Sequence, residues 1–144
     1  MRTDAERIQF LDACAATMRK VFGLEFTPFR PNDEVRNRHA WLALPRYTGC
    51  AIVAYKDSRV SIHVYSDHPV VVGKLRDVFK SAAPADLLAL PGHMQTRLSL
   101  RPAPRNPKKL YLEFAWHVSG PLAGALPDVE PASRFFNAII AGLG

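Results

Sequence analysis

Two stretches of the chain alternate strictly between apolar and polar residues, and this alternation constrains the fold more than any other feature. They are TRLSLRP, residues 96–102, and KLYLEFAWHV, residues 109–118. Successive side chains of a strand point to opposite faces of a sheet, so we expect strands over residues 97–101 and 109–118 with one apolar face each. The inward residues are Leu98, Leu100, Leu110, Leu112, Phe114, Trp116 and Val118; the outward ones are Arg97, Ser99, Arg101, Tyr111, Glu113, Ala115 and His117. Such strands are typical of an antiparallel sheet covered on one side.

A second pair of segments, CAIVAYK and RVSIHVYS, predicts a β-hairpin. If Asp57 and Ser58 form its tip, the pairs are Tyr55 with Val60, Val53 with Ile62, and Ala51 with Val64. These six residues would then share the apolar face of the hairpin. The opposite face would carry Ile52, Ala54, Lys56, Arg59, Ser61, His63 and Tyr65.

Helical patterns flank these strands. Thr3 and Glu6 form a capping box at the start of a first amphipathic helix, and Gly23 ends that helix. DHPVVVGKLRDVFKSAA predicts a second helix, and the apolar residues after Pro131 predict a third. With a further strand at HAWLALP, the order is α-β-β-β-α-β-β-α. The sequence therefore predicts one α+β domain over residues 1–144, with an antiparallel sheet of about five strands and helices packed on one face.

The positive charge of the chain is concentrated in one segment. The formal net charge is +6, from 19 Lys and Arg against 13 Asp and Glu. Five of the basic residues lie between positions 97 and 109, where no acidic residue occurs, so the rest of the chain is nearly neutral. A local excess of charge says more about binding partners than a high isoelectric point does.

This basic segment is the main candidate for a binding site. PAPRNPK, residues 102–108, joins the two predicted strands, and its prolines would stiffen the tip of the hairpin. Basic side chains beside tyrosine rings suit an anionic partner such as nucleic acid. We therefore expect a non-catalytic binding domain whose binding residues are Arg97, Arg101, Arg105, Lys108, Lys109, Tyr65 and Tyr111. The competing interpretation is that these charges only keep an exposed sheet edge from aggregating.

Other reactive side chains do not form a site of known chemistry in the sequence. The hairpin pairing would place Cys50 opposite Tyr65, with His63 on the diagonal at roughly 7 Å, which is too far for a thiol–imidazole hydrogen bond. His63 and His117 could meet if their strands were neighbours, but two histidines without carboxylates do not make a metal site. We expect no metal, no cofactor and no enzymatic activity, although an unrecognised enzyme stays open.

The remaining patterns bear on location and on an alternative function. No run approaches the ~18 apolar residues of a membrane span, and the charged N-terminal residues do not resemble a secretory signal, so we expect a cytoplasmic protein without a membrane partner. The expected order of elements resembles that of the small dimeric chaperones of bacterial protein secretion, which are typically acidic, whereas this chain is basic. The alternative function is therefore a homodimeric adaptor or chaperone-like protein that binds a protein segment.

Overall fold

The computed structural model describes residues 2–23, 27–28, 38–44, 48–81 and 90–141. The helices and strands are, in chain order, α1 (Asp4–Phe22), β1 (Thr27–Pro28), β2 (Arg38–Leu44), β3 (Thr48–Ala54), β4 (Arg59–Ser66), α2 (Pro69–Ser81), β5 (Leu98–Ala103), β6 (Asn106–His117) and α4 (Leu126–Ala141). Two short 3₁₀ helices, η1 (Gly92–Met94) and η2 (Leu122–Ala125), precede β5 and α4.

The strands form one antiparallel sheet in the order β1-β2-β3-β4-β6-β5. The α+β class and the antiparallel sheet are therefore confirmed, but the expected number of about five strands and the order of elements differ from the structure. The difference is β1, which has two residues, one of them Pro28. Two residues are too few to show an alternating pattern, and proline favours a sheet edge, where β1 lies.

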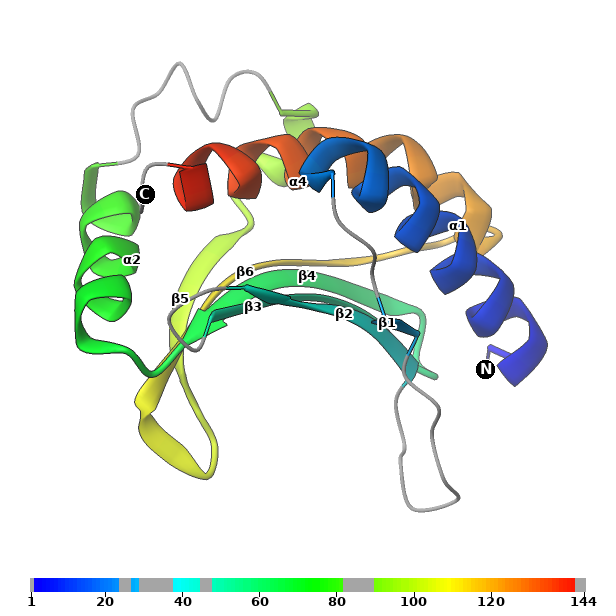
Figure 1. Cartoon of the computed structure of the whole chain (residues 1–144). Helices are drawn as coiled ribbons and strands as arrows, with labels where there is room; N and C mark the ends of the chain where they lie inside the picture. The colour runs from blue at the N-terminus through cyan, green and yellow to red at the C-terminus, as the bar shows by residue number, and fades with distance from the viewer. Residues whose placement is uncertain (1, 24–26, 29–37, 45–47, 82–89, 142–144) are drawn as a thin grey trace.

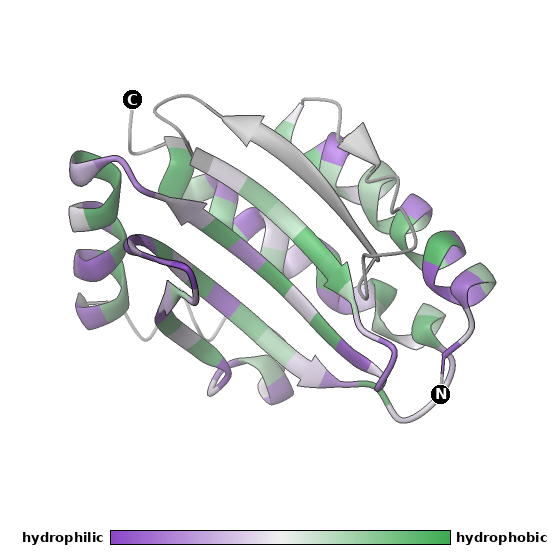
Figure 2. Ribbon diagram, turned by 90° about the horizontal axis from the view of Figure 1, so that it is seen from below, coloured by the Kyte–Doolittle hydropathy of each residue, from purple (hydrophilic) through white to green (hydrophobic). Residues whose placement is uncertain are grey.

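The helices and the sheet enclose one hydrophobic core. Helices α1 and α4 lie across one face of the sheet, and α2 stands at one end of it (Figure 1). The core residues between these layers include Phe10, Cys14 and Met18 from α1, Ile52 from β3, Ile62 from β4, Leu75 from α2, Leu112 and Phe114 from β6, and Phe136 from α4. No described helix lies on the opposite face, which Figure 2 shows from below with its strands side by side.

Helix α1 has the ends that its sequence predicts, and a buried arginine ties it to the sheet. The Thr3 hydroxyl accepts a hydrogen bond from the Glu6 backbone N–H at 3.2 Å. Gly23 ends the helix in the left-handed region with φ 71°, and its N–H donates to the Arg19 carbonyl. The side chain of Arg7 is fully buried; its Nε donates to the Ala54 carbonyl at 2.9 Å, and its Nη1 pairs with Asp4.

The pairing of β3 with β4 differs by one residue from the expected pairing. Val60, Ile62 and Val64 face the core as expected, but their partners are Ala54, Ile52 and Cys50, not Tyr55, Val53 and Ala51. A loop of three residues, 56–58, joins the strands: the Tyr55 N–H donates to the Arg59 carbonyl, and Ser58 has φ 73°. A two-residue or four-residue loop would have kept the expected pairing, whereas an odd loop moves β3 by one position and reverses its faces.

The N-terminal segment holds this turn in place. Arg2 donates from its backbone N–H to the Lys56 carbonyl and from Nε to the Ser58 hydroxyl, at 3.1 and 2.8 Å. Its Nη2 also donates to the carbonyls of Val118 and Gly120, beyond the end of β6. The turn conformation thus depends on a residue far away in sequence, which local patterns do not reveal.

The β5–β6 hairpin has longer strands and a shorter tip than expected. The inward side chains of both strands face the core as predicted. However, β5 continues to Ala103 and β6 begins at Asn106, so the seven-residue tip is reduced to a turn at Pro104 and Arg105. The pairing shifts between Pro102 and Ala103, where a proline cannot donate to the ladder. The hairpin bends away from the helices and projects below the sheet (Figure 1).

The C-terminal helix also begins earlier than predicted. Pro131, expected near the start, lies inside α4, which begins at Leu126. Val129 in this earlier part is buried in the core, as are Leu122 and Ala125 of η2 just before it, and such packing compensates for the hydrogen bond that a proline removes. Among the described residues, no helix is both long and apolar enough to cross a membrane.

The β3–β4 pairing predicts unequal costs for two substitutions on opposite faces of the sheet. Because Ile52 is fully buried in the core, Ile52→Ala should lower the free energy of unfolding by about 2–5 kcal/mol. Tyr55→Ala, on the other face and partly exposed, should cost roughly 1 kcal/mol or less. Urea unfolding followed by circular dichroism would measure both, and a larger cost at Tyr55 would contradict the pairing.

Candidate binding site on the polar face of the sheet

The face of the sheet opposite α1 and α4 carries a cluster of polar and aromatic side chains, which we call the polar face. Pairing between strands brings these residues together. On β4 and β6, Ser61 lies opposite Ala115, His63 opposite Glu113, and Tyr65 opposite Tyr111; Tyr111 in turn lies opposite Arg101 on β5. Tyr55 and Arg59, which flank the β3–β4 turn, extend the same face at one end.

A buried carboxylate, Glu113, occupies the centre of the polar face. Only 7% of its surface is exposed. Arg101 donates to it twice, from Nε to Oε1 at 3.1 Å and from Nη2 to Oε2 at 3.2 Å. The Ser61 hydroxyl donates to Oε2 at 2.5 Å, and the His63 Nδ1 lies 3.8 Å from the same oxygen. Glu113 is thus both desolvated and well supplied with hydrogen-bond donors.

These donors determine how Glu113 ionises. Burial by itself raises the pKa of the Glu113 carboxyl group, because it disfavours the charged form. Hydrogen bonds from Arg101 and Ser61, with the charges of Arg101 and His63, outweigh this effect and bring the pKa below its usual value of 4.5. The hydrogen bond to Glu113 also raises the pKa of Arg101. The pair is therefore fully ionised at neutral pH.

Three cations on the polar face each lie over a tyrosine ring. The Arg59 Cζ is 4.0 Å from the centre of the Tyr55 ring, and the Arg101 Cζ is 4.6 Å from that of Tyr111. The Lys109 Nζ is 4.5 Å from the centre of the Tyr65 ring. Arg59 and Tyr65 lie near opposite ends of β4, about 20 Å apart at the usual rise per residue, and the Arg101–Tyr111 pair lies on β5 and β6, with Tyr111 opposite Tyr65. Stacking of this kind restricts the cations and holds them on the face.

The rings themselves contact one another. His63 packs against Tyr111 with ring centres 4.9 Å apart, and Tyr65 lies 5.6 Å from Tyr111 and 5.7 Å from His63. Gly49 on β3, opposite Tyr65, gives this cluster room: a Cβ atom there would lie 2.2 Å from the Tyr65 Cζ. The glycine thus allows the tyrosine ring to lie against the neighbouring strand.

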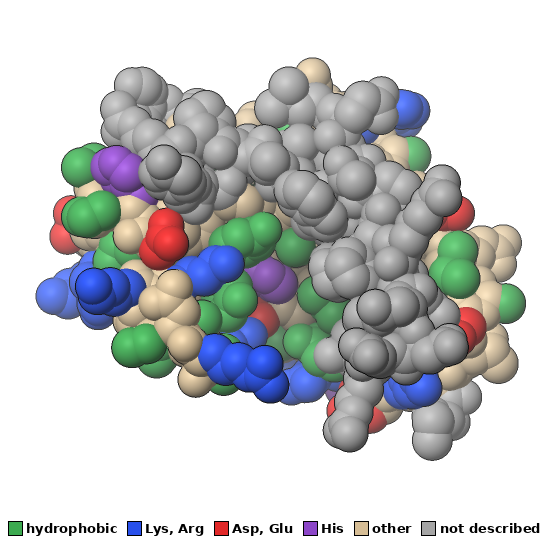
Figure 3. Space-filling model, turned by 60° about the horizontal axis from the view of Figure 1, so that its bottom comes forward, with side chains coloured by type: hydrophobic (Ala, Val, Ile, Leu, Met, Phe, Trp, Pro, Cys, Tyr) green, Lys and Arg blue, Asp and Glu red, His purple; other side chains and the backbone are tan. Residues whose placement is uncertain are grey.

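A pocket opens at the Arg59 end of the polar face. Its volume is about 240 Å³, and its lining residues are Tyr55, Arg59, Ser61, Arg101, Glu113 and Ala115. Figure 3 shows this side of the molecule, where Lys and Arg side chains in blue lie along the left and lower sides of a recess. The pocket is lined almost entirely by groups that donate or accept hydrogen bonds.

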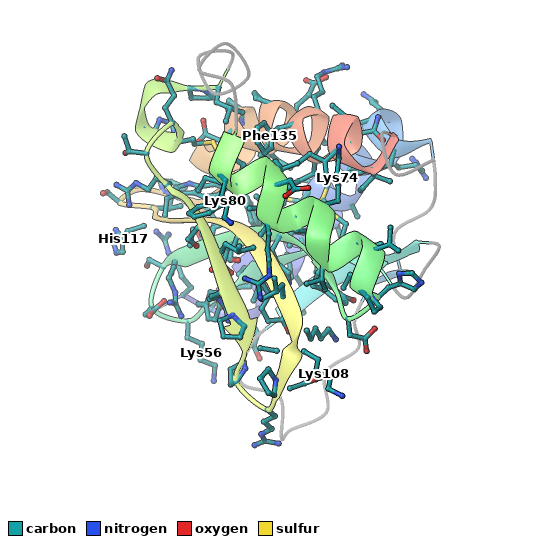
Figure 4. All side chains as sticks on the ribbon, turned by 90° about the vertical axis from the view of Figure 1, so that its left-hand side faces the viewer. Lys56, Lys74, Lys80, Lys108, His117 and Phe135 are labelled. Atoms are coloured by element: carbon teal, nitrogen blue, oxygen red, sulfur yellow. The ribbon has the colours of Figure 1, made fainter. Side chains whose placement is uncertain are left out.

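The structure brings together four of the seven residues that the sequence indicated for binding. Arg101, Lys109, Tyr65 and Tyr111 lie in contact on the polar face. Arg105 and Lys108 are exposed near the hairpin tip, and Figure 4 shows Lys108 there, at the lower end of the hairpin. Arg97 lies before β5, where its Nε donates to the His93 carbonyl at 3.1 Å, and among the described residues no hydrogen bond, ion pair or ring contact joins it to another member of this group.

The sequence placed Glu113 and Ser61 on this face without giving them a role. It placed Arg59 there as one of the basic side chains but not among the binding residues, and it placed Tyr55 on the apolar face. One signal could have drawn attention to Glu113: it is the only acidic residue on the outward side of either alternating strand. The one-residue error in the β3–β4 pairing accounts for Tyr55, because it assigned that residue to the core.

The other arrangements considered from the sequence do not form. Cys50 faces the core opposite Val64 and is fully buried, so it lies on the other side of the sheet from His63. Burial also raises the pKa of its thiol, which makes it a poor nucleophile. His63 and His117 lie on neighbouring strands but four positions apart, roughly 13 Å along the strand. Within the described ranges, no group of three metal-ligating side chains occurs.

Ser61, His63 and Glu113 resemble a nucleophile triad in composition but not in geometry. In such a triad the two nitrogens of the histidine contact different partners. Here the serine oxygen, at 3.3 Å, and the Glu113 carboxylate, at 3.8 Å, both approach the same nitrogen, Nδ1. The serine also donates its proton directly to the carboxylate, and only 1% of its surface is exposed. The arrangement supports hydrogen bonding but not nucleophilic attack.

The lowered pKa of Glu113 predicts a pH-dependent stability. A carboxyl group whose pKa is lower in the folded than in the unfolded state stabilises the fold above its unfolded pKa, and this contribution is lost as the pH falls through the folded value. Glu113→Gln should therefore reduce the free energy of unfolding at pH 7, and the gap to the wild type should narrow below about pH 4.5. Urea unfolding between pH 7 and pH 3 would measure this gap; a constant gap would show that Glu113 is not preferentially ionised in the fold.

Comparison with protein families, with curated proteins and with solved structures finds no match to this chain. Its function therefore has to be inferred from the residues of the polar face and the hairpin that extends from it.

Proposed function

We propose that this chain is a non-catalytic binding domain and that its polar face binds an anionic partner, single-stranded nucleic acid being the class that it suits best. One observation carries the proposal: three cations, each stacked on a tyrosine, follow one another across the face opposite the helices. Cations neutralise phosphates, and aromatic or guanidinium planes stack with bases regardless of their sequence.

The placement of the cations favours binding over a role in solubility alone. Charges that only protect a sheet edge would extend from the edge strand into water. Arg101 and Lys109 instead lie over rings on the face of the sheet, and Arg59 comes from β4, which has strands on both sides. The hairpin tip projects on the same side of the molecule (Figure 1) and adds two exposed cations, Arg105 in the turn and Lys108 in β6.

The alternative, a homodimeric adaptor or chaperone-like protein, has less support. It would need a contiguous apolar surface for a second copy or a peptide. Among the described residues, the large exposed hydrophobic side chains are Ile8, Val70 and Phe79. Val70 and Phe79 are nine positions apart on α2, which places them on opposite sides of that helix. These side chains therefore do not combine into one patch.

Salt dependence tests the electrostatic part of the proposal. Wild-type protein should bind a fluorescently labelled oligo(dT) of 12 nucleotides, and its affinity should fall as NaCl rises from 50 to 200 mM. Each phosphate contact with a single strand contributes about 0.7 to the slope of log affinity against log salt, so Arg105→Gln with Lys108→Gln should reduce the slope by about 1.4. Fluorescence anisotropy at four salt concentrations would give the slope.

A matched variant controls for net charge. Lys74→Gln with Lys80→Gln removes two exposed charges from α2, which lies off the polar face, so it should leave the slope nearly unchanged (Figure 4). Equal slopes for the hairpin and α2 variants would show that the binding is nonspecific attraction to a basic protein. Light scattering on the same samples reports the mass, and a stable dimer that binds no oligonucleotide would favour the adaptor alternative.

The tyrosines distinguish nucleic acid from other polyanions. Removal of a stacking ring costs about 1–3 kcal/mol per base, so Tyr111→Leu should weaken oligo(dT) binding by roughly 5- to 150-fold. The same variant should change heparin binding little, since heparin has no bases to stack. Equal losses for both ligands would instead indicate that Tyr111 acts only by positioning Arg101, and that the partner is an anionic polymer of another class.

A further inference from the structure

The pocket at the end of the polar face contains two arginines with unequal hydrogen bonding. Arg101 uses its Nε and one N–H of Nη2 for Glu113, which leaves the N–H groups of Nη1 for another acceptor. Arg59 stacks on Tyr55, and no hydrogen bond from its guanidinium to another described residue is present. A guanidinium that is held in position with its donors available is a common form of phosphate site.

The balance of charge in the pocket limits the ligands that it suits. Its lining contains two guanidinium groups, Arg59 and Arg101, and one carboxylate, Glu113. At neutral pH these sum to one positive charge. The carboxylate is fixed by Arg101 and Ser61 and is buried, so it cannot move away when an anion enters. The pocket should therefore favour a monoanion and disfavour a group with two negative charges.

We propose that this pocket binds a single phosphodiester of the nucleic-acid strand, held between Arg59 and Arg101, and that Glu113 makes it selective for one negative charge. This inference rests on the proposed function and adds the chemical group and its position. A phosphodiester has one negative charge and two unesterified oxygens, which match the available donors of the two arginines. Tyr55, under Arg59, keeps that guanidinium at the rim of the pocket.

Glu113 has a second role in this arrangement, because it orients Arg101. Two hydrogen bonds to the carboxylate fix the plane of the Arg101 guanidinium above Tyr111. The carboxylate that orients Arg101 also carries a negative charge, and this charge weakens the attraction of the pocket for anions. Glu113→Gln should thus strengthen the binding of phosphates although it lowers the free energy of unfolding. If Glu113 had only a structural role, its substitution would weaken both the fold and the binding.

The dinucleotide TpT, which has one phosphodiester, tests the inference when it is compared with thymidine and with thymidine 5′-monophosphate. NMR titrations of the full chain would give each affinity, and the spectra would show that each variant is folded. Arg59→Gln should weaken TpT binding roughly tenfold through the loss of charge-assisted hydrogen bonds. Arg76→Gln is the matched control: Arg76 is an exposed arginine on α2, off the polar face, and its loss should have little effect.

Glu113→Gln should have the opposite effect to Arg59→Gln. Removal of one nearby negative charge should tighten TpT binding by roughly fivefold and thymidine 5′-monophosphate binding by more, so the preference for the monoanion should disappear. If Glu113→Gln does not fold, the test rests on Arg59→Gln, because the Arg59 side chain is exposed and its substitution should not disturb the fold.

The outcomes separate this inference from the proposed function. If oligo(dT) binds with the predicted salt dependence but Arg59→Gln leaves TpT affinity unchanged, the pocket does not bind the phosphodiester and only this inference is wrong. Weaker TpT binding by a folded Glu113→Gln variant would also overturn it. If wild-type protein binds no oligo(dT) at low salt, the proposed function fails as well.

Discussion

The ion pair of Glu113 with Arg101 is the interaction on which the polar face depends. A carboxylate with 7% exposure is costly unless donors compensate for the lost water, and here Arg101 and Ser61 provide three hydrogen bonds. These bonds connect β4, β5 and β6 in one network. Arg101 is held above Tyr111, and Tyr111 packs against His63 and Tyr65. The ion pair therefore orders the rings that the proposed ligand would contact.

The two faces of the sheet differ because apolar and polar residues alternate along both β4 and β6, and the pairing places like residues on the same face. Val60, Ile62 and Val64 pair with Trp116, Phe114 and Leu112 on the core side, so the intervening residues must share the other side. The face that carries the candidate site is thus a direct consequence of packing the core beneath α1 and α4. A shift of one residue in this pairing would bury the charges and expose the apolar residues, which is why the pairing is strongly specified.

The distribution of charge links the fold to the proposed function. Four of the five clustered basic residues, Arg101, Arg105, Lys108 and Lys109, lie in one hairpin, and β4 adds Arg59 to them. Glu113 reduces the charge at the centre of the polar face, whereas Lys109, Lys108 and Arg105 leave the hairpin side strongly positive. A strand of nucleic acid would thus meet a strongly attractive side and a more selective pocket at the Arg59 end, and we expect attraction and selectivity to reside in different residues.

The sequence by itself determined that three helices and the alternating strands β4, β5 and β6 form, although not the start of α4 or the length of the hairpin tip. It also determined the inward faces of these strands and the concentration of positive charge, because each of these is set by local spacing and composition. It also indicated Arg101, Lys109, Tyr65 and Tyr111, which the structure brings together. Only the tertiary structure decided the β3–β4 pairing, since the three-residue loop is held by Arg2 from the N-terminal segment. It also decided that Arg101 pairs with Glu113 and that Arg97 lies apart, because the contacts of a long side chain depend on the neighbouring strand. Local patterns determine the face of the sheet on which a side chain lies, but the residues that it contacts are determined by which strands are neighbours.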